Sequence, residues 1–386
     1  MPSISKRSET ISHSPIRRMS FLAEKTEGDL ISFSIGEPDF TTPDNIIKAA
    51  NEALLRGETH YAPNKGFIEL RKAVSKSYEP DGVVYDPETE IAVTCGGMQA
   101  LNLIFQSTVD EGVEVIVSNP CFPNYLEQIK ACGGTPVCVP VFEEDGFVFN
   151  IENLRNAVTD KTKMIVINTP CNPTGGVIGL EVLKQIAELA EEKDLWILSD
   201  EVYKNFDYSG VYTSTIASIG KMKERTIIVN SASKAYAMTG WRVGYVLGSE
   251  ELVAAVVKFQ EGQVSSVNSA AQIGALEALE GTQEPLYEMI EVYKRRRRIL
   301  VDGLNSIEGI SCIEPAGAFY VFVNIKKTGL ESWEFAERLL AEQKVVVVPG
   351  VGFGSAGEGF IRLSYAVSEE NILKGIEKIR MFVESL

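Results

Sequence analysis

The sequence is poor in histidine and has no closely spaced pair of cysteines. Its two histidines are His13 and His60, and none of the six cysteines forms a C-x-x-C pair. These shortages exclude the usual zinc clusters and leave a cysteine nucleophile without a base. We therefore expect small core residues in a reducing compartment at Cys95, Cys121, Cys132, Cys138, Cys171 and Cys312.

Long apolar runs and an excess of basic residues are also missing. No apolar run has the length that spans a bilayer, and the N-terminus has no continuous apolar signal-peptide core. Because 37 Lys and Arg stand against 53 Asp and Glu, the net charge is −16, which argues against binding to nucleic acid. We expect a cytoplasmic protein that binds neither a membrane nor a nucleic acid.

One basic run, KRRRR at Lys294–Arg298, is of the kind that can contact nucleic acid. It lies within an expected long helix of an acidic protein. We predict that it forms a solvated helix face, whose aliphatic stems cover apolar neighbours.

The middle of the chain alternates short apolar strands with helical patterns. Strands are expected at 91–95, 115–117, 164–168, 195–198 and 227–229, with helices following near 101–105, 124–131 and 180–191. Strands that are apolar at consecutive positions are typical of a sheet buried on both faces. The pattern therefore predicts an α/β fold with a mostly parallel sheet between two helix layers.

The pattern changes after about residue 282. Segment 284–307 is predicted to be one long helix, and after it come strands at 319–323, 345–348 and 360–363 and a helix with Ile372, Ile376 and Ile379 on one face. This is a second, smaller α/β unit. Residues 1–44 cannot form a core alone, so we expect a large domain at 45–283 and a small domain made of 1–44 and 284–386.

Residues suited to ligand binding follow the predicted strands, at the edge where ligands bind in open α/β sheets. In chain order they are Gly96, Gly97 and Met98, then Asn172, then Asp200 with Tyr203, and then Ser231 with Lys234. Taken singly, each has an ordinary structural explanation, such as a turn, a helix cap, a core phenol or an ion pair. Together they place an amine, a carboxylate, a phenol, an amide and a phosphate cradle at one sheet edge, and pyridoxal 5′-phosphate uses all of these groups.

The reactive end of this cofactor explains four of the residues. Its aldehyde forms a Schiff base with an amine, which Lys234 can supply. Its pyridine nitrogen must stay protonated to draw electrons from a carbanion, and a buried carboxylate such as Asp200 would hold that proton. Its ring oxygen needs hydrogen-bond donors, which Tyr203 and Asn172 provide.

The sequence also contains residues that can bind the phosphate and the ring face of the cofactor. A phosphate favours a fork-shaped cation, hydroxyls and helix-end amides, which Arg242, Ser231 and the Gly96-Gly97 pair offer. The flat ring favours an aromatic side chain to stack on, and Phe122 follows the right strand.

Motifs along the chain resemble those of the fold-type I, class I/II pyridoxal-phosphate aminotransferases, which are aspartate aminotransferase-like. They are ISFSIGEPDF (31–40), HYAPNKGFIELR (60–71), CNPTGG (171–176), SDEVY (199–203), SASKAYAMTGWRVGY (231–245) and GFIRLSYA (359–366). They run in family order from about residue 16 to the end of the chain. The resemblance implies a large domain with a mostly parallel seven-stranded sheet and a smaller α/β domain.

The resemblance gives the residues named above these same roles, with Lys234, Asp200 and Tyr203 as the catalytic set. It also implies that Lys234 carries the proton between Cα and C4′ and that Asn172 is shared with the substrate carboxylate. Three further residues are implied: Arg362 as the clamp of the substrate α-carboxylate, Gly36 as a backbone contact near the substrate, and Tyr61 reaching the phosphate of the neighbouring subunit. Tyr61 therefore implies a homodimer with shared sites.

Met98 occupies a position of the cofactor cradle where many relatives carry a polar or basic residue. Its apolar side chain leaves room for neutral or aromatic substrates. The implied activity is transfer of an amino group from an L-amino acid to a 2-oxo acid, with 2-oxoglutarate expected, by a ping-pong mechanism. The alternatives are a carbon–sulfur β-lyase or a cyclopropane-forming synthase on the same fold. A non-enzymatic transcription regulator is disfavoured, because the family match begins near residue 16 and leaves no room for a DNA-binding module.

Overall fold

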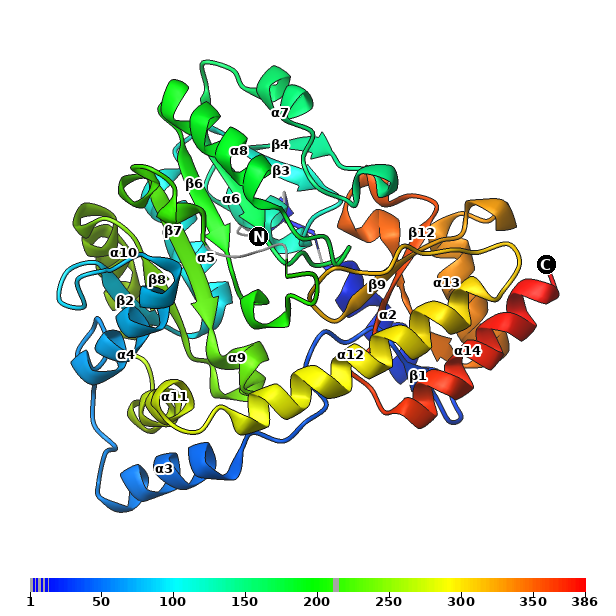
Figure 1. The fold of residues 1–386 in the computed structure, drawn as a ribbon, viewed down its shortest axis with the longest axis horizontal. Coiled ribbons are helices and arrows are strands. Elements are labelled where there is room, and N and C mark those ends of the chain that lie inside the picture. The colour runs from blue at the N-terminus through cyan, green and yellow to red at the C-terminus, as the bar shows by residue number, and fades with distance from the viewer. Residues whose placement is uncertain (1–2, 4, 6–7, 10, 13, 211–214) are drawn as a thin grey trace.

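Seven strands form the large sheet, in the order β2-β8-β7-β6-β5-β3-β4 (Figure 1). This computed structural model describes residues 3, 5, 8–9, 11–12, 14–210 and 215–386. The strands of the sheet are β2 (Ile91–Thr94), β3 (Glu114–Asn119), β4 (Thr135–Pro140), β5 (Thr162–Asn168), β6 (Trp196–Asp200), β7 (Thr226–Ser231) and β8 (Gly244–Leu247).

The large sheet is mostly parallel, as the sequence predicted. Strands β4, β3, β5, β6 and β7 run parallel to one another, and β8 is antiparallel to both β7 and β2. The sequence analysis had not found β4 or β8. Strand β4 reads TPVCVP, is only partly buried and contains two prolines, whereas β8 has four residues and begins at Gly244. Neither segment therefore carries a clear apolar strand pattern.

Side chains of β5 alternate between two helix layers, as the period of a strand requires. Ile165 and Ile167 pack on one side with α8, and Met164 and Val166 pack on the other side with α5. The first layer contains α7 (Ile151–Ala157) and α8 (Leu180–Glu192), and the second contains α5 (Gly96–Thr108), α6 (Pro123–Ala131) and α10 (Glu250–Val264). Near β2 and β8 lie α3 (Asp44–Leu55), α4 (Ile68–Tyr78) and α11 (Ser269–Glu280), while α9 (Ala232–Ala235) follows β7.

Two small sheets accompany the large one. Strands β11 (Val348–Pro349), β12 (Phe360–Ser364) and β9 (Tyr320–Asn324) form an antiparallel sheet in that order, and β1 (Ile31–Ser32) pairs in parallel with β10 (Val345–Val346). The prediction of a single strand over 345–348 was wrong, because the chain leaves one sheet at Val346 and enters the other at Val348.

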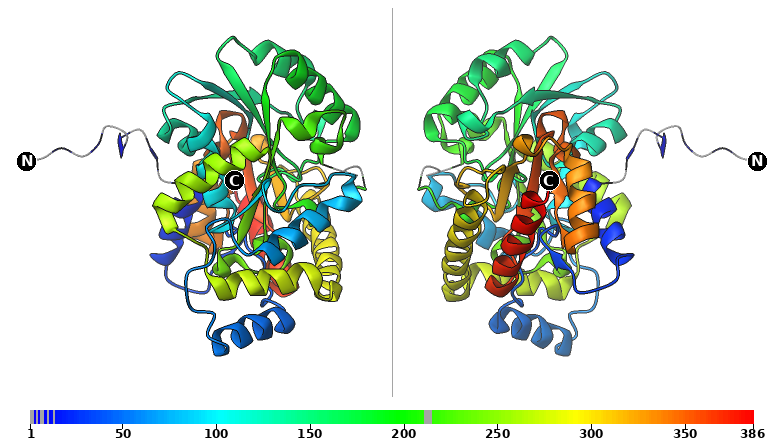
Figure 2. Two further views of the ribbon diagram at one scale, coloured as in Figure 1. Left: turned by 90° about the vertical axis from the view of Figure 1, so that its left-hand side faces the viewer. Right: turned by 90° about the vertical axis from the view of Figure 1, so that its right-hand side faces the viewer.

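The helices around the small sheets are α2 (Pro15–Glu24), α12 (Glu284–Asn305), α13 (Ser332–Gln343) and α14 (Glu369–Glu384). Helices α12 and α14 pack side by side (Figure 2). Short 3₁₀ turns are η1 (Glu79–Asp81), η2 (Glu143–Asp145), η3 (Lys204–Phe206), η4 (Ile216–Ser218), η5 (Met222–Glu224), η6 (Thr239–Trp241), η7 (Lys326–Thr328), η8 (Gly350–Phe353) and η9 (Ser355–Gly357). Among the described residues, none of the helices combines the length and the apolar composition that crossing a bilayer requires.

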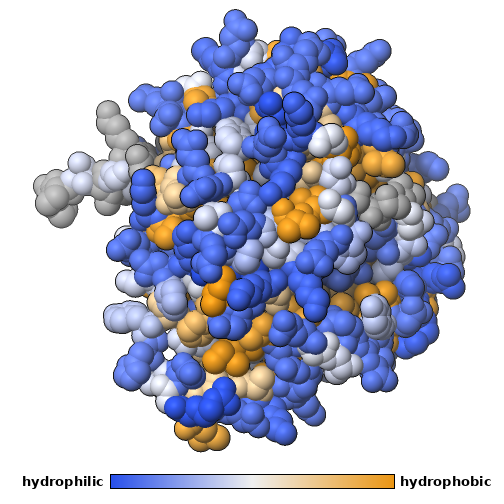
Figure 3. All heavy atoms as spheres, turned by 60° about the vertical axis from the view of Figure 1, so that its left-hand side comes forward, coloured by the Kyte–Doolittle hydropathy of each residue, from blue (hydrophilic) through white to orange (hydrophobic). Residues whose placement is uncertain are grey.

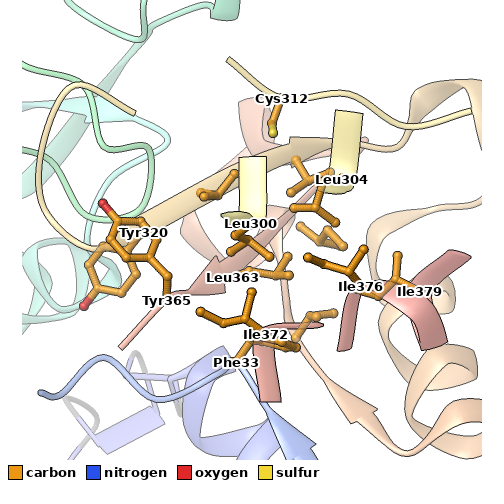
Figure 4. Packing of buried hydrophobic residues seen from close by; sticks show 14 of the residues in the cluster. Phe33, Leu300, Leu304, Cys312, Tyr320, Leu363, Tyr365, Ile372, Ile376 and Ile379 are labelled. Carbon is orange, nitrogen blue, oxygen red and sulfur yellow. The ribbon is translucent and has the colours of Figure 1, made fainter. Parts of the chain in front are cut away.

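One hydrophobic cluster joins the two ends of the chain. Leu304 of α12, Leu363 of β12 and Ile372 of α14 converge in it, and Phe33 reaches it from the N-terminal segment (Figure 4). Because Phe33 is fully buried there, the N-terminal segment is fastened to the C-terminal helices by burial of apolar surface as well as by the β1–β10 pair.

The basic run of α12 is not a solvated face throughout, so that prediction was wrong for two of its residues. Arg296 and Arg297 are buried. Arg296 is paired with Asp39 at 2.7 Å, and Arg297 is paired with Glu314 at 2.9 Å. Buried arginines need such partners, so these side chains hold α12 to the N-terminal segment and to the chain before β9.

The six cysteines are all free thiols, but they are not all core residues. Cys121, Cys171 and Cys312 are buried, as expected. Cys138 is exposed and Cys95 and Cys132 are half-buried, which corrects the prediction for these three. Cys138 lies in β4, an outermost strand of the large sheet, which has a neighbouring strand on one side only and is only partly buried.

The packing in Figure 4 generates a stability prediction. Leu304→Ala should lower the free energy of unfolding by about 2–5 kcal/mol, because the leucine is fully buried and the change leaves a cavity. The matched control is Leu373→Ala in α14, where the leucine is 58% exposed and the change should cost no more than about 0.5 kcal/mol. Urea unfolding of both variants measures the difference, and equal losses would contradict the assignment of Leu304 to the core.

Candidate active site

A cavity of ≈ 600 Å³ lies where β5, β6 and β7 end and where β9 and β12 approach them. It brings together most of the residues that the sequence predicted for the cofactor and the substrate. These are Gly36, Gly97, Met98, Phe122, Asn172, Asp200, Tyr203, Ser231, Lys234, Arg242 and Arg362. They come from segments far apart in the chain, and the parallel sheet gathers them because its strand ends meet at one edge.

Lys234 projects into this cavity from α9, directly after β7. Its Nζ donates a hydrogen bond to the carbonyl oxygen of Gly36, and it lies 5.9 Å from the ring centroids of both Tyr203 and Phe319. Burial lowers the pKa of Lys234 to about 8, although the negative charge of Glu37 acts in the opposite direction. On the order of a tenth of this amine is therefore neutral at pH 7, far more than for an ordinary lysine, and the neutral form is the nucleophile.

Asp200 ends β6 and is also buried. The hydroxyl of Tyr125 donates to its Oδ2 at 2.5 Å, and the backbone N–H of Val202 donates to its Oδ1 at 3.3 Å. Burial raises the pKa of Asp200 to about 6, and these hydrogen bonds restrain the increase. Asp200 is thus mostly ionised at neutral pH, and the two hydrogen bonds fix the orientation of its carboxylate.

Tyr203 meets Tyr320 in the wall of the cavity, with their hydroxyl oxygens 2.7 Å apart. Burial raises the pKa of Tyr203 well above its usual value, so its hydroxyl keeps its proton and can donate it in a hydrogen bond. Tyr320 also approaches Gly36 closely, because a Cβ at Gly36 would lie 2.2 Å from the Tyr320 hydroxyl. Any larger residue at position 36 would displace the phenol.

Arg362 of β12 is the largest fully buried side chain. Its Nη1 donates to Asn172 Oδ1 at 3.1 Å, and its Nη2 donates to the carbonyl oxygen of Ser34. The rings of Tyr320 and Phe353 lie 4.5 Å and 5.0 Å from its Cζ. Its Nε has no hydrogen-bond partner among the described residues, and no carboxylate there pairs with it. A buried guanidinium of this kind suits an incoming carboxylate.

The N-terminus of α5 forms the opposite end of the cavity. Gly96 begins the helix with φ +76°, and a Cβ there would lie 2.5 Å from Nη2 of Arg242. Arg242 itself has φ +58°, and its Nη1 donates to the carbonyl oxygen of Thr239 at 2.8 Å. Free helix amides, a guanidinium and the Ser231 hydroxyl therefore face the same space, which suits an anion.

Three predicted residues need separate comment. Phe122 lines the cavity and meets Tyr125 edge to face, with ring centroids 5.5 Å apart. Met98 lines it too, and its Sδ lies 3.2 Å from Nε2 of Gln128. Tyr61 does not reach this cavity, because its side chain is 89% exposed on the surface of the chain.

Some residues of the site were missed by the sequence analysis. Tyr125 stands three positions after Phe122, at helical spacing, so the neighbouring pair could have been found. Tyr320 and Arg17 also line the cavity, but they lie in segments whose sequence does not indicate which strand ends they face.

The comparisons with known proteins agree with this geometry. The family "Aminotransferase class I and II" matches residues 28–379. The chain belongs to this family. It is 43% identical over 379 residues to aromatic-amino-acid aminotransferase 2 of Thermococcus litoralis, with 97% of both chains covered. It is 41% identical over 362 residues to aspartate aminotransferase of Bacillus subtilis, with 92% of both covered.

A solved structure supports the same assignment. The aspartate aminotransferase from Thermus thermophilus with maleate superposes with a TM-score of 0.93 at 39% identity, covering 99% of this chain and 100% of that one. The family, the fold class, the enzyme class and the cofactor predicted from the motifs are therefore confirmed: the protein is a pyridoxal-phosphate-dependent aminotransferase. The matches do not favour the lyase and cyclopropane-forming alternatives.

The shifted pKa of Lys234 generates a prediction for the cofactor-free aminotransferase. Cyanate modifies only neutral amines, so the modification rate of Lys234 should reach half its maximum near pH 8. An ordinary lysine, with a pKa of about 10.4, should still be far below its maximum at that pH. Mass spectrometry of a digest follows every lysine peptide in one experiment, and the other peptides are internal controls. A midpoint near 10 for Lys234 would contradict the effect of burial.

Proposed function

We propose that this aminotransferase moves the amino group of an acidic or aromatic L-amino acid to a dicarboxylic 2-oxo acid, 2-oxoglutarate being expected, in a ping-pong cycle. The observation that carries the proposal is the shared cavity. A partly neutral lysine and a mostly ionised aspartate lie in it together with a buried arginine that has no carboxylate partner among the described residues. The similar proteins that are named for aspartate and for aromatic amino acids support both donor classes.

The residues of the cavity fit the cofactor. When bound, pyridoxal phosphate supplies the aldehyde that takes up the amino group and the ring that stores an electron pair. Lys234 would hold the cofactor through its amine and would move a proton to and from the substrate Cα. Asp200 would hold a proton at the pyridine nitrogen, and the hydrogen bond from Tyr125 keeps this carboxylate in position. Tyr203 and Asn172 would bind the ring oxygen.

The other end of the cofactor is held by the anion site. Arg242, the Ser231 hydroxyl and the helix amides at Gly96 and Gly97 would bind the phosphate, and Phe122 would pack against the ring. Met98 lies beside these amides and contributes an apolar wall to the cradle.

Arg362 and Gly36 receive the substrate in this proposal. The guanidinium binds the α-carboxylate together with Asn172, and the backbone of Gly36 lies against the substrate. We also propose that residues 45–283 form the large domain and that 1–44 with 284–386 form the small one. The β1–β10 pair and the common cluster of Phe33 with Leu304 support this division. Substrate binding would then draw Arg362 toward the cofactor site and exclude water.

Arg362→Lys tests the carboxylate clamp. It should lower kcat/KM for every amino acid donor by roughly 2–5 kcal/mol of transition-state stabilisation, because lysine cannot form the two parallel hydrogen bonds. The matched measurement uses the decarboxylated amine of the same donor, which should lose little. Steady-state kinetics of wild type and variant with both compounds give the answer. An equal loss for donor and amine would show that Arg362 only supports the structure.

We further propose a homodimer with shared sites, in the cytoplasm. Tyr61 is 89% exposed and Leu55 of α3 is 88% exposed, which is unusual for large apolar side chains on a lone subunit. Figure 3 shows apolar side chains at the bottom of the molecule, where Figure 1 places α3. In this proposal Tyr61 crosses to the phosphate of the other subunit. The free thiols support a reducing compartment.

Mixed dimers test the shared site. Lys234→Ala and Tyr61→Ala should each be impaired alone. Dimers assembled from both at equal amounts should recover about a quarter of wild-type activity, because half of the dimers are mixed and each of these has one intact site. The control mixes Lys234→Ala with Asp200→Ala, whose residues belong to the same subunit's site, so no intact site forms. Activity is measured after co-refolding, and recovery in neither mixture would exclude the crossing role of Tyr61.

A further inference from the structure

One cation of the cavity has no role in the proposed function. Lys234, Arg242 and Arg362 are assigned to the aldehyde, the phosphate and the α-carboxylate, but the cavity is also lined by Arg17 of α2. Within the described residues, the side chain of Arg17 has no hydrogen bond, ion pair or ring contact. In a chain with net charge −16, an arginine without a partner beside a cavity marks a place that accepts an anion.

Contacts at the start of α2 place Arg17 on the substrate side of the cavity. Helix α2 packs against β10, β11 and η8. Its first residue, Pro15, lies so close to η8 that a Cβ on Gly352 would be 2.5 Å from the Pro15 Cβ. The next residue of η8 is Phe353, whose ring lies 5.0 Å from the Arg362 guanidinium. Arg17 therefore belongs to the helix that packs on the side of the proposed α-carboxylate clamp.

The segment before α2 is fastened at the other side of the cavity. The backbone N–H of Ser12 donates to Oε2 of Glu127 at 2.7 Å, and Glu127 belongs to α6, the helix that follows Phe122. Ser12 thus lies at α6, whereas Pro15, at the start of α2, lies at η8. Both attachments hold Arg17 over the cavity, although its own side chain is exposed.

Arg18, the next residue of the same helix, has partners for its side chain. Arg18 is paired with Glu337 at 3.2 Å, and its guanidinium lies 4.0 Å above the ring of Trp333. Successive residues of a helix point about 100° apart, so Arg17 and Arg18 reach different surroundings. Arg18 is held by its partners on α13, whereas Arg17 remains available for a ligand.

We propose that Arg17 binds the side-chain carboxylate of dicarboxylic substrates, such as aspartate, glutamate and their 2-oxo acids. This inference rests on the proposed function, since it assumes that Arg362 takes the α-carboxylate. Glu37, the acidic neighbour in the lining, already accepts a hydrogen bond from Thr239 at 3.1 Å. The cavity lining also contains the apolar side chains of Ile16, Ile35 and Leu101, which suit an aromatic side chain that does not use the guanidinium.

The test compares Arg17→Met with Arg18→Met, two adjacent and equal changes on one helix. The values of kcat/KM are measured with aspartate and with phenylalanine, using the same 2-oxo acid acceptor. Arg17→Met should lower the aspartate-to-phenylalanine ratio of kcat/KM by about 10- to 100-fold, which is the range of a hydrogen bond to a charged group. Arg18→Met should leave this ratio within about twofold of wild type, because its partners lie outside the cavity.

Binding of unreactive acids gives an independent readout. Calorimetry with the cofactor-loaded enzyme should show that Arg17→Met weakens binding of maleate about 10- to 100-fold more than binding of 3-phenylpropionate. Arg17→Lys, which keeps the charge, should restore part of the maleate affinity. An unchanged ratio, or equal losses for both acids, would overturn the proposal.

The outcomes distinguish a failure of the proposed role of Arg17 from a failure of the proposed substrate class. If the wild-type enzyme turns over no dicarboxylic substrate at all, the proposed acceptor is wrong, whatever Arg17 does. If the wild-type enzyme uses dicarboxylic and aromatic substrates and Arg17→Met changes neither ratio, the proposed function stands and the role of Arg17 is refuted.

Discussion

The site depends on one buried positive charge, the guanidinium of Arg362. Removing a charge from water is costly unless partners replace the lost hydration. Here the replacements come from four parts of the chain: the carbonyl of Ser34, the amide of Asn172 and the flanking rings of Tyr320 and Phe353. The N-terminal segment, the loop after β5, strand β9 and η8 must therefore meet around Arg362. None of these partners is negatively charged, so the guanidinium stays available to a carboxylate from outside.

The same burial acts in opposite directions on the two reactive groups. It raises the pKa of Asp200 to about 6 and lowers that of Lys234 to about 8, because loss of water penalises whichever form is charged. Burial alone would raise the pKa of Asp200 further, and the hydrogen bond from Tyr125 stabilises its ionised form. The charged form of Lys234 is stabilised less, because Glu37 raises the lysine pKa while Arg362 and Arg242 lower it. An ionised acid and a reactive amine can therefore coexist in one enclosed space at neutral pH.

The sequence predicted those parts of the site that follow buried strands. Asn172, Asp200, Ser231 and Lys234 could be placed because a parallel sheet brings its strand ends together. Other features arise from contacts between distant segments and leave no local pattern. Tyr320 meets Tyr203 only because β9 folds back onto the large sheet, and the run 345–348 divides between two sheets because each half finds a different partner. The burial of Arg296 depends likewise on Asp39, which is remote in sequence.

Chemistry and substrate selection rest on different kinds of structure in this protein. Lys234 and Asp200 are positioned by strands in the centre of a buried sheet, where packing from both faces leaves little freedom, and α5 begins after the fully buried strand β2 at its margin. In the proposed substrate orientation, the substrate side chain faces α2 and the stretch around Ile35. Helix α2 and the residues before it are held by a few contacts to η8 and α6. A substitution in α2 or near Ile35 can therefore change which substrate side chain is accepted without moving the amine of Lys234. The same arrangement of Lys234 and Asp200 is thus compatible with both acidic and aromatic substrates.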